Sequence, residues 1–145
     1  MHVDSLLRFS SAQALTATAV STNVVDGSVA DRDFGIGNQL YIVTVVTVAL
    51  TDAGSDTTVT VDLQSDTADT FGSATKVQEL YIIPALAAIG DTFIATINPM
   101  VTRERYLRLN YTMTNGSLST GTVTSFITDS VQKWRAMAKS WEIDS

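Results

Sequence analysis

Hydrophobic and polar residues alternate along several segments of the chain, as they do in half-buried β-strands. In ERYLRLNYT, residues 104–112, Leu107, Leu109 and Tyr111 fall on one face of the expected strand and Arg108 falls on the other. Val, Ile and Thr are frequent in such segments, and these β-branched residues favour a pleated surface over a helix. The predicted strands span 40–50, 57–64, 78–83, 92–97, 104–113 and 120–128, with one or two more within 14–26.

Turn signals separate these alternating segments. TDAGSD at 51–56 reads as a hairpin loop, and TNGS at 114–117 carries Asn115-Gly116, a strong signal for a tight hairpin turn. The region 66–77 reads as a longer loop. Short strands with regular turns indicate an all-β, jelly-roll-like antiparallel β-sandwich rather than alternating strand and helix units.

Only two segments have helical spacing of their apolar residues. VDSLLRFSSAQAL at 3–15 gives a weak helical pattern, and DSVQKWRAMAKSWEI near the C-terminus places Val131, Trp134, Ala138 and Trp141 on one stripe. No repeat and no linker divides the chain. We therefore expect one β-sandwich domain over residues 1–128, followed by a short C-terminal helical or extended arm over residues 129–145.

The amino-acid composition argues against several classes of catalytic and binding site in this chain. The chain has no cysteine, and its single histidine, His2, follows the first methionine, so a cysteine nucleophile, a histidine-based triad or a zinc site of the usual kind is not expected. The net charge of −6 argues against general binding of nucleic acid, which needs a basic surface. The longest apolar run, at 40–50, is too short to span a bilayer, and no signal peptide pattern is visible. The sequence predicts a soluble protein that is not an enzyme.

Three features that could indicate a binding or catalytic site do not support one. Gly35-x-Gly37 precedes a strand rather than a helix, whereas a phosphate-binding loop needs the opposite order. The aspartates between positions 52 and 69 do not have EF-hand spacing and suit turns. Paired carboxylates for glycoside hydrolysis cannot be singled out by counting. We therefore expect no catalytic residues, no metal ligands, no cofactor and no small-molecule substrate.

Three of the nine basic residues, Arg103, Arg105 and Arg108, lie within six positions. Strand alternation places Arg105 and Arg108 on opposite faces, so they cannot converge on one ligand. Arg105 shares a face with apolar residues and is expected to reach a carboxylate at the rim of the sheet or on a partner. We expect structural or interfacial ion pairs here rather than a dedicated anion site.

The C-terminal stripe admits two interpretations. The helix could pack back onto its own sandwich, or the arm could dock on a neighbouring protein, because Trp and Arg are frequent interface anchors. The flanking basic residues Lys133, Arg135 and Lys139 would suit an acidic partner surface.

Three stretches together resemble one known family. They are FSSAQALTATAVSTNVVD at 9–26, DRDFGIGNQLYIVTVV at 31–46 and RERYLRLNYTMTNGSLSTGTVTSFI at 103–127. Their order and spacing are similar to those of the tailed-phage capsid cement (decoration) protein family, including a short β-rich member from a Bordetella phage. The middle of the chain, 51–98, matches only in pattern, and 129–145 extends beyond the resemblance.

The resemblance implies a jelly-roll-like sandwich that binds the outer surface of a phage head, bridges major capsid protein subunits and stabilises the shell. It implies a homo-oligomer (dimer or trimer), made in the host cytoplasm and located on the virion, without membrane or nucleic-acid partners. Candidate contacts with the capsid or between subunits are Arg8, Phe9, Arg103, Arg108, Trp134, Arg135 and Trp141. The rival interpretation is a carbohydrate- or receptor-binding sandwich, which would need Tyr41, Tyr81, Tyr106 and Tyr111 to gather on an exposed surface.

Overall fold

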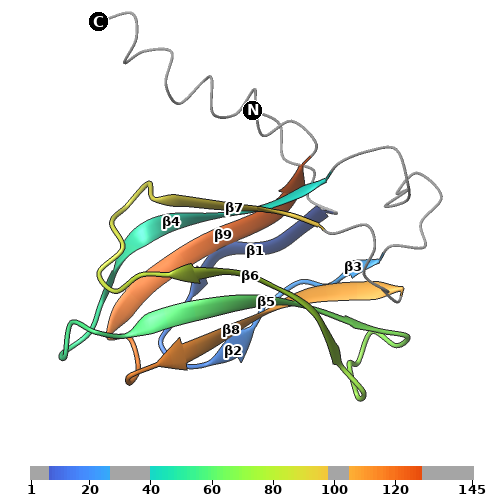
Figure 1. The fold of residues 1–145 in the computed structure, drawn as a ribbon, viewed down its shortest axis with the longest axis horizontal. Coiled ribbons are helices and arrows are strands. Elements are labelled where there is room, and N and C mark those ends of the chain that lie inside the picture. The colour runs from blue at the N-terminus through green and yellow to red at the C-terminus, as the bar shows by residue number, and fades with distance from the viewer. Residues whose placement is uncertain (1–6, 27–39, 98–104, 129–145) are drawn as a thin grey trace, which may run out of the picture.

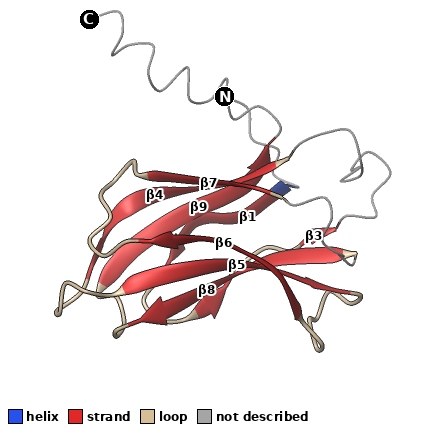
Figure 2. Cartoon of the chain, in the orientation of Figure 1, coloured by secondary structure: helices blue, strands red, loops and turns tan. Residues whose placement is uncertain are grey.

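The computed structural model describes residues 7–26, 40–97 and 105–128. These residues form strands joined by short connections, as Figures 1 and 2 show. The strands are β1 (Arg8–Ala14), β2 (Ala19–Val20), β3 (Val25–Asp26), β4 (Tyr41–Thr51), β5 (Thr58–Asp66), β6 (Thr75–Ile83), β7 (Thr92–Thr96), β8 (Tyr106–Thr114) and β9 (Thr120–Thr128).

Two antiparallel sheets face each other as layers of a sandwich (Figure 1). One has the order β1-β9-β4-β7, and the other has the order β2-β8-β5-β6 with β3 also paired to β8. Because β2 and β3 pair with the same strand one after the other, they act as a single interrupted strand. The sequence predicted the all-β sandwich, and the strand order is that of a jelly roll, in which successive strands repeatedly change sheet.

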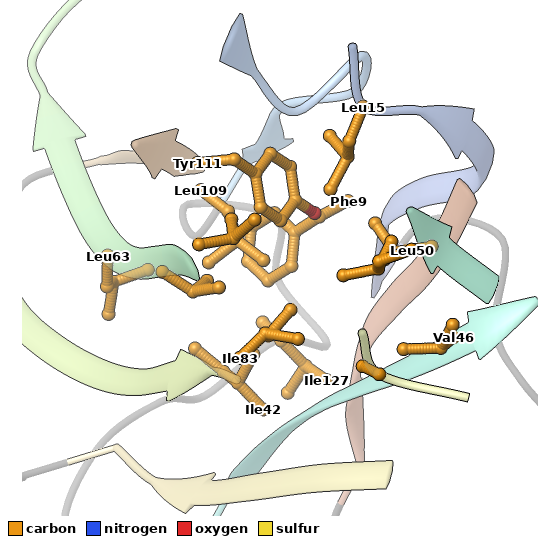
Figure 3. Packing of buried hydrophobic residues seen from close by; sticks show 14 of the residues in the cluster. Phe9, Leu15, Ile42, Val46, Leu50, Leu63, Ile83, Leu109, Tyr111 and Ile127 are labelled. Carbon is orange, nitrogen blue, oxygen red and sulfur yellow. The ribbon is translucent and has the colours of Figure 1, made fainter. Parts of the chain in front are cut away.

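The core lies between the two sheets and is filled by alternate residues of each strand. On β8 these are Leu107, Leu109 and Tyr111, the face that the alternation predicted. Figure 3 shows Tyr111 and Leu109 together with Phe9 of β1 and Ile42 of β4, so side chains from both sheets meet there. The alternation is thus the main physical link between this sequence and its two-layer fold.

The helix expected over 3–15 is wrong in its described part, where Arg8–Ala14 is strand β1. The pairing of β1 with β9 has register shifts between Arg8 and Ser10 and between Ser10 and Gln13. Such bulges interrupt the period-2 alternation, so the local sequence no longer resembles a strand. Pairing with a distant strand therefore overrides a weak local helical pattern.

The two predicted hairpin turns are turns, but neither closes a hairpin. The segments 51–56 and 114–117 join β4 to β5 and β8 to β9, and in each case the two strands belong to different sheets. Asn115 and Gly116 do have the positive φ values, 70° and 124°, that the Asn-Gly signal predicts. The hairpin lies instead at the predicted longer loop, where β5 pairs with β6 across residues 67–74.

Candidate interaction surfaces

The antiparallel order gives the sandwich two distinct ends. Four connections meet at one end, which we call the loop end: residues 15–18, 52–57, 84–91 and 115–119. The opposite end carries the starts of β1, β6 and β8 and the hairpin at 67–74 (Figure 1). The candidate residues from the sequence divide between these ends and the core.

The arginines near the start of β8 are held by partners within the chain. The Arg105 guanidinium donates from Nε and one terminal nitrogen to the two carboxylate oxygens of Asp26, at 3.0 and 2.9 Å. Its guanidinium carbon also lies 4.7 Å from the centre of the Tyr106 ring. The expected carboxylate partner of Arg105 is therefore confirmed, and it is an intramolecular one.

Arg108 lies on the opposite face of β8 and makes different contacts. Its Nε donates to the Gln64 side-chain oxygen at 2.8 Å, and its guanidinium carbon lies 4.3 Å from the centre of the Phe71 ring. These contacts attach β8 to β5 and to the hairpin that follows it. The two arginines do not converge on one ligand, as the alternation predicted.

The remaining candidate interface residues have varied positions. Arg8 starts β1 opposite Phe126 of β9. Phe9 was expected at an interface, but it is fully buried and belongs to the central apolar cluster, because the strand turns it inward. Its side chain is therefore a core residue rather than an accessible contact. Arg103, Trp134, Arg135 and Trp141, as well as the C-terminal arm as a whole, lie outside the described residues.

A chain of buried hydroxyl groups crosses the core and joins the two sheets. The Tyr111 hydroxyl is 2.8 Å from Ser10 Oγ and 2.9 Å from Ser125 Oγ, and Ser125 Oγ is 2.8 Å from Thr44 Oγ1. Thr44 in turn hydrogen-bonds the Tyr81 hydroxyl. Each polar group thereby has a partner within the apolar interior, which removes the cost of leaving it unpaired.

Burial raises the pKa of both phenols, although their hydrogen bonds act in the opposite direction. The tyrosines stay protonated, and their contacts are with other hydroxyls. We read this chain of hydroxyls as a structural connection between β1, β4, β6, β8 and β9.

The four tyrosines do not gather on one exposed surface. Tyr111 is fully buried, and Tyr81 packs against the core. Tyr106 lies beneath Arg105, and Tyr41 packs against a small cluster formed by Val43 and Phe126 on the other face of the four-stranded sheet. This dispersal leaves the rival carbohydrate-binding interpretation without the aromatic platform that it required.

The loop end has an acidic character that sequence reasoning did not identify. Its four connections contain Asp52, Asp56 and Asp91 and no Lys or Arg. The basic residues of the described part are Arg8, Lys76, Arg105 and Arg108, and all lie toward the opposite end. The charge of the sandwich is thus asymmetric, with an uncompensated negative end.

Asp52 is held in place within this end. Its Oδ2 accepts a hydrogen bond from the Thr57 hydroxyl at 3.0 Å and from the Asp56 amide at 3.2 Å. Burial alone would raise the pKa of Asp52, but these bonds and further backbone bonds outweigh it, so the pKa lies below its usual value. The negative charge of Asp52 therefore persists at neutral pH.

Apolar side chains are also exposed at the loop end. Leu86 and Ile89, in the connection between β6 and β7, are 52% and 69% exposed, and Val48 on β4 is 44% exposed. The sequence signal was available: the stretch IIPALAAIG, residues 82–90, is apolar without alternation and contains a proline, as an apolar loop would. The alternation predicts a strand for residues 78–83, which includes only the first two residues of this stretch.

Within the described residues, no group of His, Cys, Asp and Glu is arranged to hold a metal ion, and no helix could cross a membrane. Comparison with known protein families finds a match that covers most of the chain. The model of the Bbp16 family matches residues 9–127, which include the whole sandwich except the outermost residues of β1 and β9. No curated protein matches the chain.

Proposed function

The chain belongs to the Bbp16 family, which is a Bordetella phage protein family, and from this premise we propose that it is a capsid cement (decoration) protein. In this role it binds the outer surface of an assembled phage head, bridges neighbouring major capsid protein subunits and stabilises the shell. It acts without catalysis, is made in the host cytoplasm and functions on the virion as a homo-oligomer.

The observation that carries this proposal is the coincidence of the family match with a jelly-roll sandwich. Jelly rolls recur in viral capsid proteins. Two face-to-face sheets give a rigid body, and the fold protects the edge strands of the sheets from pairing with other chains. The fold alone would not select this function, since lectins use it too. The phage-related family favours the virion role.

The internal contacts of the sandwich also suit a cement protein. Tyr111, Ser125 and Thr44 connect the sheets through the core, while Arg105 and Arg108 attach β8 to its neighbours. A body held in this way keeps its surface shape when it binds, which lowers the entropic cost of each contact. Repeated over many copies, modest contacts then add through avidity.

The proposal is tested by thermal rupture of phage shells. Shells purified from a phage lacking the protein are heated with and without added pure protein, and release of DNA is followed with an intercalating dye. We expect the added protein to co-sediment with shells and to raise the rupture temperature. Shells of an unrelated phage are the control. A protein that does not co-sediment, or that leaves the rupture temperature unchanged, would contradict the proposal.

A further inference from the structure

Three exposed apolar side chains at the loop end form a surface that we call the apolar tip: Val48, Leu86 and Ile89. Leu86 and Ile89 belong to the connection between β6 and β7, residues 84–91. No charged residue occurs between Glu79 and Asp91, so Asp91 is the one charged residue of this connection. Single exposed apolar residues are ordinary, whereas a group of them on one end marks a contact surface.

Backbone hydrogen bonds place the connection between β6 and β7 alongside β4. The Leu50 amide donates to the Ala87 carbonyl at 2.9 Å, and the Gly90 amide donates to the Val46 carbonyl at 2.8 Å. The connection therefore runs alongside β4, and Ile89 lies level with Val48 between these two bonds. The tip spans a strand and the adjoining loop rather than a single segment.

The tip is also held in a fixed shape. The Ala88 amide donates to Asp91 Oδ2 at 2.9 Å, and the Asp91 amide donates back to the Ala88 carbonyl at 3.1 Å. Leu86 has a φ of 60°, a left-handed conformation that is unfavourable for leucine. Backbone strain that the surroundings maintain is a recurrent feature of functional loops.

Charge and size together define the partner. The carboxylates of Asp52, Asp56 and Asp91 belong to the same end, so a complementary surface has an apolar pocket with a basic rim. Three side chains expose far less than the roughly 800 Å² per partner of a stable interface. The tip alone is therefore too small to hold two copies together in solution, and it suits one contact repeated across an assembled lattice.

We propose that the apolar tip docks this protein onto the assembled capsid shell, in an apolar pocket of the shell surface that is rimmed by Lys or Arg. This inference rests on the proposed function and adds the orientation: the loop end faces the shell.

The test compares variants of the tip with a matched variant elsewhere. Leu86→Asn places a polar residue that tolerates positive φ, and Ile89→Thr removes apolar surface at the most exposed position. Val24→Thr is the control, because Val24 is also an exposed apolar residue and lies outside the tip. Each full-length protein is titrated onto shells lacking it, and binding is measured by co-sedimentation at low and high NaCl.

We expect the double variant Leu86→Asn/Ile89→Thr to bind at least tenfold more weakly, while Val24→Thr binds as the wild type does. Unfolding midpoints should be unchanged for Ile89→Thr and unchanged or higher for Leu86→Asn, which separates loss of contact from loss of fold. Wild-type binding should weaken as NaCl increases, because the acidic end meets a basic rim.

Normal binding by the double variant would overturn the inference and leave the proposed function standing. Failure of the wild type to bind shells would overturn the proposed function itself. A tip variant that changes a soluble oligomer into monomers, without weaker shell binding, would identify the tip as a contact between copies and would also overturn the inference.

Discussion

Gly121, at the start of β9, has no room for a side chain. Its φ is 148°, and a Cβ built there would lie 2.3 Å from Leu50 Cδ2 and 3.3 Å from Leu50 Cα. Leu50 is almost fully buried, and its backbone is paired with Ala87, so it cannot easily move aside. The close approach of β9 to β4 therefore requires glycine at this position.

We predict that Gly121→Ala lowers the free energy of unfolding by about 1–3 kcal/mol, because the methyl group overpacks a filled site and the backbone disfavours a side chain there. Urea denaturation measures the change. Gly72→Ala is the matched control, since a Cβ at Gly72 meets no atom within 4 Å. An equal loss in both variants would show that the contact with Leu50 is not the cause.

At the scale of elements, the alternation located the long strands to within a few residues. It worked because each strand turns one face to a single core, as Leu107 and Leu109 do on β8. It failed for β1, where the bulges remove the period that defines a strand. Local pattern is informative only where the strand stays regular.

Turn chemistry identified where the chain reverses but not which sheet it enters. Asn115-Gly116 has the predicted backbone, yet β8 and β9 lie in different layers. The distinction depends on pairing between distant strands, which no short segment specifies. For the same reason the proximity of Val48 and Ile89 could not be predicted from the sequence, and the apolar tip could be recognised only from the fold.

The hairpin between β5 and β6 depends on one carboxylate. Asp66 Oδ2 accepts a hydrogen bond from the Ser73 amide at 2.8 Å, and Oδ1 accepts one from the Ala68 amide at 3.3 Å. The bond from Ser73, opposed by burial and supported by the other bonds, lowers the pKa of Asp66 below its ordinary value of 3.8. The ionised form thus fixes both sides of the connection.

A lowered pKa in the folded state means that the unfolded chain binds this proton more readily. The contribution of Asp66 to stability is therefore complete above the unfolded pKa and is lost as the pH falls through the folded pKa. We predict that Asp66→Asn is less stable than the wild type near neutral pH, and that the difference shrinks as the solution is acidified below about pH 4.

Urea denaturation at a series of pH values measures this difference. Asp69→Asn is the matched control, because Asp69 is an exposed carboxylate in the same connection. A difference between wild type and Asp66→Asn that stays constant with pH would contradict the assignment of the stabilising charge to Asp66.

At the scale of the whole molecule, the two ends of the sandwich differ in charge and in the interactions of their side chains. The opposite end concentrates ion pairs and hydrogen bonds that connect strands, such as Arg105 with Asp26 and Lys76 with Asp62. Among the described residues no ion pair lies at the loop end, which instead carries the carboxylates and the exposed apolar side chains of the tip. A protein that must bind in one orientation benefits from this asymmetry, because the field of its charges aligns it before contact.

The jelly roll also places the first and last described strands side by side. β1 pairs with β9, and Tyr111 on β8 bonds Ser10 on β1 and Ser125 on β9, so the fold closes only after most of the chain has been made. Pairing over so long a separation carries a large loop-closure cost and slows folding. Bringing β9 and β1 together along the chain should reduce that cost.

We predict that a circular permutant refolds faster than the wild type at similar stability. The permutant joins the two termini by a flexible Gly/Ser linker and opens the chain within the exposed residues 53–55. In its sequence β9 then comes before β1, and only residues 129–145, the linker and residues 1–7 separate the two strands. Each halving of a closed loop reduces its cost by about 0.6 kcal/mol, and the expected gain in rate is up to about tenfold. Stopped-flow circular dichroism measures it against a wild-type chain carrying the same linker at its C-terminus. An unchanged rate would mean that the pairing of β1 with β9 forms after the rate-limiting step, and that the transition state is organised by strands already close in sequence, such as β5 and β6.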